Sequence, residues 1–330
     1  MKIRRGLVAT LTVALGSLAL AACGWSDAST SSSDEAVTVA IGIPWNGAAG
    51  KQPVVTGPLG YAIDKGLAQP IFEEHGFKLG KPVGFNNGPP IAQALQSGDL
   101  QVGVIGDTPA VLSKASGLDL DAVTIARPTA DIWFLTKVGG VKSIKELAGK
   151  KVALQFGSNF DKYGRAVLEQ NGVLDDVELV NLLFADALPA LDRGEVDAVP
   201  VPASTAGLWR KTADFPVLSK ASVDNPELLA TTVSLVSHDF YEKHPEIAKA
   251  VWEATKAGQE AIEEDHDDFV DFVAEATGAP AEVVADEQLF RYGTEPADAE
   301  GLTAVASTLQ FLLDAGTVKQ GFDTDAWTVR

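Results

Sequence analysis

The stretch IAQALQSGDLQVGVIGDTPA, residues 91–110, reads as an amphipathic helix, a glycine stop, an acidic residue and a buried strand. A second stretch, ALPALDRGEVDAVPVPASTA (187–206), aligns with it without a gap and repeats the same order of features. Two copies 96 residues apart are too few and too distant for a solenoid. We therefore predict two lobes built on one plan; the alternative is that such units look alike in any α/β protein.

Strand and helix patterns alternate on either side of these two copies. The β-branched run VTVAIGIPW (37–45) predicts a buried first strand, and the chain from about residue 241 onward is mostly helical in pattern. This alternation predicts an α/β fold with mostly parallel sheets flanked by helices, in which a ligand binds beyond the carboxyl ends of the strands. Further strands are predicted at 132–137, 151–156 and 177–183, and further helices at 60–76 and 143–150.

The composition is that of a soluble globular protein, and the charge excludes one class of partner. The chain has 330 residues, of which 46% are hydrophobic and 22% charged, which is enough for two domains and a sizeable core. A formal net charge of −19 and the lack of a basic stripe argue against nucleic-acid binding. With one cysteine there is no disulfide framework, and the four histidines lack metal-ligand spacing, so no metal or cofactor is expected.

The amino terminus has the features of an export signal. Lys2, Arg4 and Arg5 precede an apolar run over residues 7–22, which is short for a membrane span. The run ends in LAAC at Cys23, which resembles the lipobox of bacterial lipoproteins, where the cysteine becomes a lipidated amino terminus. We predict a signal peptide over residues 1–22, lipidation of Cys23 and a flexible Ser-rich linker over 23–36.

Four stretches together resemble the solute-binding proteins of ABC importers for sulfonates, taurine, nitrate and related molecules. They span residues 86–120, 143–173, 191–199 and 238–251, and their order and spacing carry the resemblance. It implies a two-lobe type II periplasmic-binding fold that closes on a ligand. We expect residues 37–128 and 232–330 to form lobe 1 and 129–231 to form lobe 2, with crossovers near 127–133 and 229–234.

The same resemblance implies the function and the partners. We expect an extracytoplasmic binding protein, anchored to the cell membrane through Cys23 and most simply monomeric, that delivers a small molecule to an ABC permease and its ATPase subunit. No catalytic motif such as G-x-S-x-G or H-E-x-x-H occurs, so no enzyme activity is expected. The alternative is an extracytoplasmic enzyme on the same fold that acts on a small organic acid.

Candidate ligand-binding residues on the first wall follow the predicted strands. Trp45 and Asn46 end the first strand, where an aromatic ring stacks on a ligand or packs under a loop. Asp107 either caps the helix that follows it or contacts ligand. The remaining candidates here are Gly88 and Pro89, whose helix start faces the cleft in the family, Thr108, and Trp133 at the suspected hinge, which alternatively packs in the core.

On the second wall the family offers oxyanion donors at positions that match Gly157, Ser158 and Asn159. Pro202 and Ala203 stand where relatives commonly have an aromatic residue, and Asp161 stands where they have a polar, non-acidic one. Asp161 either fills the helix start internally or faces the cleft and receives a cationic group. This acidic residue puts a simple sulfonate in doubt and favours a zwitterionic or amine-bearing ligand.

Overall fold

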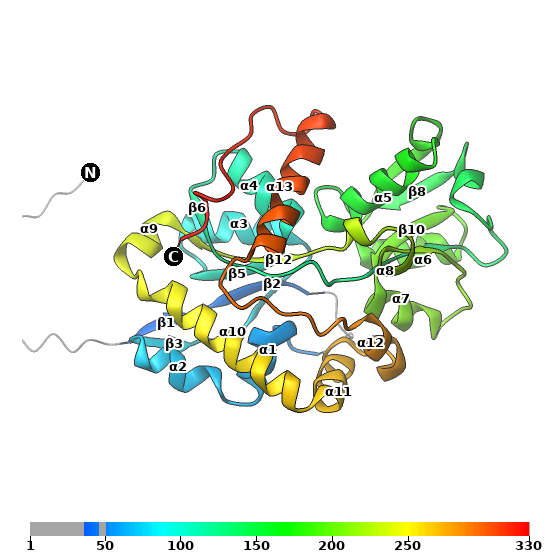
Figure 1. Ribbon diagram of the computed structural model, residues 1–330. Coiled ribbons are helices and arrows are strands. Elements are labelled where there is room, and N and C mark those ends of the chain that lie inside the picture. The colour runs from blue at the N-terminus through cyan, green and yellow to red at the C-terminus, as the bar shows by residue number, and fades with distance from the viewer. Residues whose placement is uncertain (1–35, 46–50, 330) are drawn as a thin grey trace, which may run out of the picture. The chain divides into compact units, whose positions relative to one another are not determined.

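The computed structural model describes residues 36–45 and 51–329, and its strands form two five-stranded sheets (Figure 1). Sheet I has the order β4-β2-β5-β12-β6, and sheet II has the order β11-β7-β10-β8-β9. A short parallel pair, β1 (Val37–Val39) and β3 (Phe77–Leu79), lies outside both sheets. The strands of sheet I are β2 (Ile41–Pro44), β4 (Val83–Phe85), β5 (Val102–Gly106), β6 (Leu120–Ile125) and β12 (Thr232–Ser237). The strands of sheet II are β7 (Ile132–Thr136), β8 (Lys151–Leu154), β9 (Glu178–Asn181), β10 (Ala198–Pro202) and β11 (Val217–Lys220).

The internal similarity of the sequence corresponds to an internal similarity of the fold. Helix α3 (Gly88–Ser97) passes through Gly98 into β5, and helix α6 (Phe184–Asp192) passes through Gly194 into β10. Both glycines have positive φ, 82° and 72°, which ends the helix. Strands β5 and β10 are each the central strand of their sheet. The prediction that both halves follow one plan is confirmed.

In each sheet four of the five strands run in the same direction, as predicted for a mostly parallel sheet, and one strand runs in the opposite direction. Strand β12 runs antiparallel to β5 and β6, and β7 runs antiparallel to β10 and β11. These are the strands by which the chain returns to sheet I and enters sheet II. Both begin at the edge where the parallel strands β5 and β10 end, so they must run in the opposite direction.

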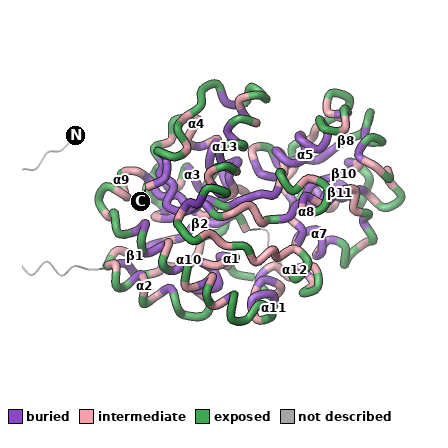
Figure 2. Tube along the Cα trace, in the orientation of Figure 1, coloured by how far each residue is buried: buried purple, intermediate pink, exposed green. Residues whose placement is uncertain are grey.

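Helices cover both faces of each sheet, and their apolar sides form the core. Figure 2 shows the buried residues along the strands and the inward faces of the helices. One face of sheet I is covered by α3, α4 (Asp107–Ala115) and α13 (Ala299–Asp314), and the other by α1 (Gly57–Asp64), α2 (Ala68–Glu74) and α10 (Glu246–Glu264). Sheet II packs against α5 (Asn159–Gln170) and α8 (Ala221–Asp224) on one face and α6 and α7 (Ala203–Arg210) on the other. The remaining helices are α9 (His238–Lys243), α11 (His266–Thr277) and α12 (Ala281–Glu287), with 3₁₀ turns at Ile144–Leu147, Leu174–Asp176 and Pro226–Leu228.

Several local predictions were wrong. The helix predicted over 60–76 is divided into α1 and α2, and the one predicted over 143–150 is a single 3₁₀ turn because strand β8 begins at Lys151. Strands β6, β11 and β12 were not predicted. The apolar run at 7–22 and Cys23 lie outside the described residues, and within 36–45 and 51–329 no helix has the length and apolar character needed to cross a membrane.

The C-terminal part of the chain also reaches sheet II. Val283 of α12 packs against the apolar cluster under α7, and Lys220 at the end of β11 forms an ion pair with Asp286 at 3.2 Å. A Cβ atom at Gly207 of α7 would lie 2.9 Å from Val283, so this close approach needs the glycine. The predicted lobe boundaries at 128/129 and 231/232 stay predictions.

Candidate functional site

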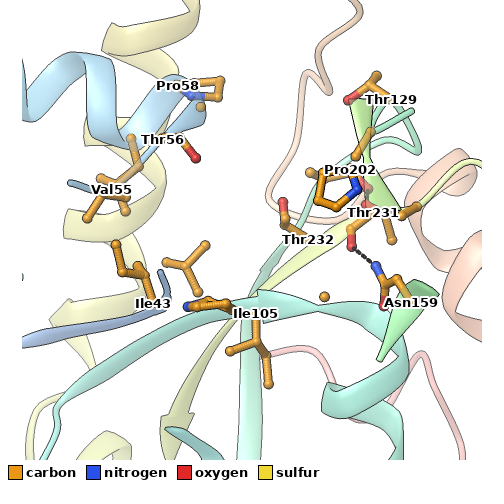
Figure 3. Close-up of a pocket in the computed structure, with 18 of the residues that line it drawn as sticks. Ile43, Val55, Thr56, Pro58, Ile105, Thr129, Asn159, Pro202, Thr231 and Thr232 are labelled. Carbon is orange, nitrogen blue, oxygen red and sulfur yellow. Dashed lines mark hydrogen bonds between the residues drawn. The ribbon is translucent and has the colours of Figure 1, made fainter. Parts of the chain in front are cut away.

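A cavity of about 440 Å³ lies at the edge where the two sheets face each other. Figure 3 shows Ile43 and Ile105 of sheet I on one side and Pro202 and Asn159, from the sheet II half, on the other. Thr231, directly before β12, also lines it. The cavity therefore touches both halves and a segment that joins them, which is the geometry in which one ligand can hold two lobes together.

Four helices begin at this cavity because each follows a strand or loop that ends there. Their first residues line it: Gly57 of α1, Gly88 of α3, Asn159 of α5 and, one residue into α7, Ser204. The N-cap side chains Thr56 and Asn87 make no capping hydrogen bond. Helix starts present backbone N–H groups and a partial positive charge, so this part of the cavity suits an anionic group.

Asn159 ties the two halves together beside the cavity. Its Oδ1 accepts a hydrogen bond from the N–H of Thr108 at 3.0 Å, and its Nδ2 donates to the carbonyl oxygen of Thr231 at 3.3 Å (Figure 3). A Cβ atom at Gly106 would lie 2.5 Å from Asn159 Oδ1. A glycine at the end of β5 is thus required for α5 to dock at this distance.

Gln155 makes a second contact between the halves and is the candidate for ligand contact that the predictions missed on this wall. It is buried, and its Nε2 donates to the carbonyl oxygen of Asn86 at 3.0 Å. Gln155 lines the cavity, and its Oε1 is buried with no hydrogen-bond partner among the described residues. An orphaned buried acceptor costs free energy, so a donor on a ligand would satisfy it.

A buried ion pair lies behind the site. The Nζ of Lys162 in α5 is 3.0 Å from a carboxylate oxygen of Asp107 at the start of α4, and it donates to the Thr308 hydroxyl of α13 at 2.7 Å. The side chains are 8% and 1% exposed for Lys162 and Asp107. This pair links the helix on sheet II to two helices on sheet I, and neither residue lines the cavity.

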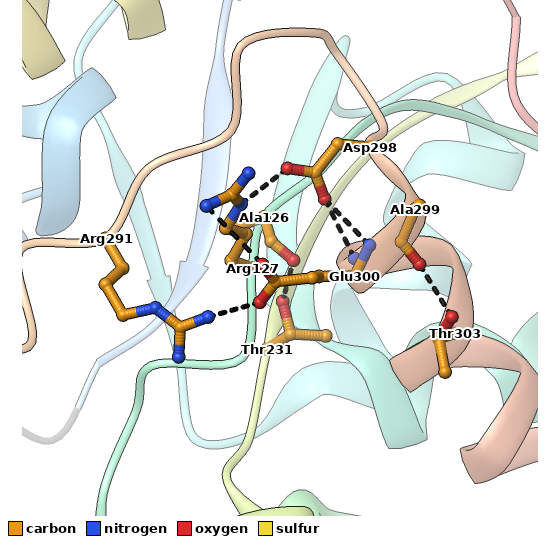
Figure 4. A network of polar contacts seen from close by, with 9 residues as sticks. Ala126, Arg127, Thr231, Arg291, Asp298, Ala299, Glu300 and Thr303 are labelled. Atoms are coloured by element: carbon orange, nitrogen blue, oxygen red, sulfur yellow. Dashed lines mark hydrogen bonds and ion pairs between the residues drawn. The ribbon is translucent and has the colours of Figure 1, made fainter.

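The two arginines that line the cavity form ion pairs with carboxylates of the protein. Arg127, in the first crossover, contacts Asp298 at 2.5 Å and Glu300 at 3.5 Å, and Arg291 forms an ion pair with Glu300 (Figure 4). Burial acts to raise the pKa of Asp298, but the hydrogen bonds from Arg127 and the Gly301 N–H outweigh it and hold that pKa below its usual value. These arginines therefore fix the position of α13 rather than present free charge to the cavity.

The predicted site residues divide into three groups. Those that line the cavity are Trp45, Gly88, Ser158, Asn159 and Pro202. A second group does not line the cavity: Pro89, Asp107, Thr108, Trp133, Gly157, Asp161 and Ala203. Asn46 and Cys23 lie outside the described residues.

Two of the residues behind the wall have structural contacts that account for them. Trp133 is 3% exposed, and its indole N–H donates to Asp131 at 2.7 Å, which matches the core-packing alternative. Asp161 accepts from the N–H of Gly157 at 3.0 Å and pairs with Arg165 at 2.7 Å. Of the two interpretations of Asp161, these contacts favour the internal one, in which the carboxylate fills its own helix start.

A further wall of the cavity comes from the C-terminal half and was not predicted. It carries the aromatic residues Trp252 of α10, Phe269 of α11 and Tyr292, together with the carboxyl group of Glu287. Burial, with the nearby charge of Asp131, raises the pKa of Glu287 to about 8. The amphipathic pattern of these helices gave no signal, because their apolar residues serve the core and the cavity alike.

The sequence profile described as NMT1/THI5 like matches residues 58–268, which is more than half of the chain. Among curated proteins, the chain is 27% identical over 209 residues to a putative aliphatic sulfonates-binding protein of Escherichia coli (strain K12), a match that covers 62% of this chain and 64% of that protein. It is 30% identical over 168 residues to the taurine-binding periplasmic protein of the same strain, covering 50% and 52%. The matched segments thus span less than two thirds of these relatives.

Solved structures resemble the chain over most of its length. The alkanesulfonate-binding protein SsuA from Xanthomonas axonopodis pv. citri, bound to MOPS, matches with a TM-score of 0.74 at 21% identity and covers 90% of this chain and 99% of that one. The desulfurization enzyme DSZB matches with a TM-score of 0.67 at 16% identity, covering 89% and 96%. The fold is thus shared by binding proteins and an enzyme. From the profile match and this architecture, the chain belongs to the NMT1/THI5-like family and has the type II periplasmic-binding fold.

Proposed function

We propose that this chain is the extracytoplasmic solute-binding component of an ABC importer of the sulfonate and taurine type. The observation that carries the proposal is the cavity of about 440 Å³ lined from both sheets, with four helix starts at its wall. Its size fits one small organic molecule, and the helix starts supply donors for an acidic group. The binding functions named for the curated relatives support the same conclusion.

The mechanism follows from the way the two halves are joined. Only a closed arrangement lets a ligand contact sheet I, α5 and the Thr231 segment at once, so binding shifts the equilibrium toward closure. The Asn159 and Gln155 hydrogen bonds between the halves add to the closed form. The closed protein then docks on a permease served by an ATPase subunit, and lipidation of Cys23 holds it at the cell membrane.

The test is to identify and rebind the natural ligand. Protein purified under native conditions is denatured, the released small molecules are identified by mass spectrometry, and the ligand is added back to ligand-free protein. We expect one ligand per chain and a smaller radius of gyration in small-angle scattering. A stoichiometry of two, or binding without compaction, would contradict a shared cavity that closes.

The same experiment separates a binding protein from an enzyme on this fold. A receptor returns the ligand chemically unchanged after prolonged incubation, whereas an enzyme converts it. Within residues 36–45 and 51–329 there is no cysteine and no group of three or more potential metal-ligating side chains. The binding functions named for the curated relatives favour the receptor.

A further inference from the structure

Glu287 is a charged residue of the cavity wall that takes no part in the ion-pair networks around it. It is the last residue of α12, lines the cavity and is partly buried. Its carboxyl group accepts a hydrogen bond from the adjacent Gln288 amide at 3.3 Å, and the backbone N–H of Ser204, at the start of α7, also acts to lower its pKa. Among residues 36–45 and 51–329, no Lys, Arg or His forms an ion pair with it within 4 Å.

The cations of the surrounding elements already have partners. Arg291, which follows α12, pairs with Glu300, and Arg127 pairs with Asp298 and Glu300. Lys220 of β11 pairs with Asp286 and lies 3.8 Å from the centre of the Trp133 ring. In this part of the described chain, Arg291, Arg127 and Lys220 are thus each paired with a carboxylate other than Glu287.

A second carboxylate beside Glu287 increases the negative potential there. Asp131 is 6% exposed and accepts hydrogen bonds from the N–H of Ile132, the indole of Trp133, and the N–H and hydroxyl of Ser222 at 2.7–2.9 Å. Four donors stabilise an ionised carboxylate. The donors near Glu287, the Gln288 amide and the backbone N–H of Ser204, do not outweigh its burial, so its ionised form is costly.

The wall that the C-terminal half contributes to the cavity also carries apolar and aromatic residues. Trp252, Phe269 and Val273 approach from α10 and α11, and Tyr292 follows α12. An ammonium group is attracted to a carboxylate and to the faces of aromatic rings, and its carbon chain gains from the apolar surface. The starts of α1, α3 and α5, which also line the cavity, suit an anion.

We propose that Glu287 is an ammonium-binding residue, so that the solute carries a protonated amine in addition to an acidic group at the helix starts. This inference rests on the proposed solute-binding function and adds a specificity-determining residue to it. The ammonium nitrogen lies against the carboxylate of Glu287, and a short carbon chain crosses the cavity. A solute with the acidic group alone leaves Glu287 without a partner and binds more weakly.

The test compares two sulfonates that differ in one group. In 3-aminopropane-1-sulfonate the ammonium group occupies the place of the terminal methyl group of butane-1-sulfonate, and both are titrated calorimetrically into ligand-free protein at pH 8.5. We expect the amine to bind at least tenfold more tightly to the wild type. Glu287→Gln should reduce this preference to less than threefold, whereas Glu282→Gln, an exposed residue of the same helix, should retain it.

A second measurement needs no variant. At pH 7, binding of the amine by wild-type protein should release close to one proton, seen as a difference in heat between two buffers of different ionisation enthalpy that are neither amines nor sulfonates. Equal affinity for the two sulfonates, or a preference that survives in Glu287→Gln, would overturn the ammonium site while leaving solute binding intact. Binding of neither compound would also overturn it, and the proposed function would then be decided by the ligand released from native protein.

Discussion

Replacing Lys162 by methionine should destabilise the protein by about 3 kcal/mol. The substitution keeps the apolar stem but removes the ammonium group that lies 3.0 Å from Asp107, whose side chain is 1% exposed. Removing one partner of a buried ion pair costs about 3–5 kcal/mol, because the other charge stays buried without compensation. The lower end applies here, since the Thr308 hydroxyl and the more distant Thr231 N–H at 3.4 Å still donate to Asp107.

The assay is urea unfolding followed by tryptophan fluorescence at pH 7. The double variant Lys162→Met/Asp107→Asn should lie within about 1 kcal/mol of the wild type, because an asparagine can donate to Thr308 and accept from Thr231 without a charge. The control is Lys249→Met, whose exposed pair with Glu246 at 3.2 Å is screened by water, so its loss should leave the unfolding curve almost unchanged. A loss below about 1 kcal/mol in Lys162→Met, or a double variant no more stable than the single one, would refute this reasoning.

Three further predictions follow from the chain and the site. Cys23→Ser should move the protein from the membrane fraction to the soluble fraction without changing its circular dichroism; retention in the membrane fraction would contradict lipidation. Asp161→Asn should lower the free energy of unfolding by about 1 kcal/mol and leave solute affinity unchanged, because the carboxylate is held by Gly157 and Arg165; a tenfold loss of affinity would place it in the cleft instead. The pKa of Glu287 is raised from 4.5 to about 8 in the folded protein, so its contribution to stability is full below pH 4.5 and is lost as the pH rises to 8. In urea titrations from pH 4.5 to 9, the wild type should therefore lose about 2 kcal/mol or more relative to Glu287→Gln, and parallel curves would contradict the burial of this carboxyl.

The sequence was sufficient for those features that depend on local pattern. The gap-free alignment of 91–110 with 187–206 predicted the two central strands, since a helix, a glycine with positive φ and a buried strand leave a clear trace in residue order. Strand β12 was missed, and the antiparallel direction of β7 and β12 was not predicted, because nothing local distinguishes an antiparallel apolar strand from a parallel one. Their direction depends on where the rest of the chain enters the sheet.

The site was predictable where strands and helices meet and not elsewhere. Ser158, Asn159 and Pro202 follow strand ends, and a strand end at a sheet edge marks a cleft. Asp107 follows the same rule but lies behind the wall, because Lys162, 55 positions away in sequence, draws it into a buried pair. Glu287 and Trp252 lie on helices whose place beside the cavity depends on long-range packing. The residues next to them in the sequence therefore do not indicate that they line a cavity.

The position of β12 in sheet I constrains the order in which the chain can fold. β5 and β6 are not hydrogen-bonded to each other; each pairs with β12, which ends at Ser237. All five strands of sheet II lie between Ile132 and Lys220, so that sheet can close from one continuous segment. Sheet I cannot be completed until β12, which follows sheet II in the chain, has been synthesised. Pairings between strands so far apart in sequence form slowly. Until synthesis has passed residue 231, β5 and β6 each have an edge that lacks its partner β12. Sheet I, whose first strand is made first, is therefore completed after sheet II.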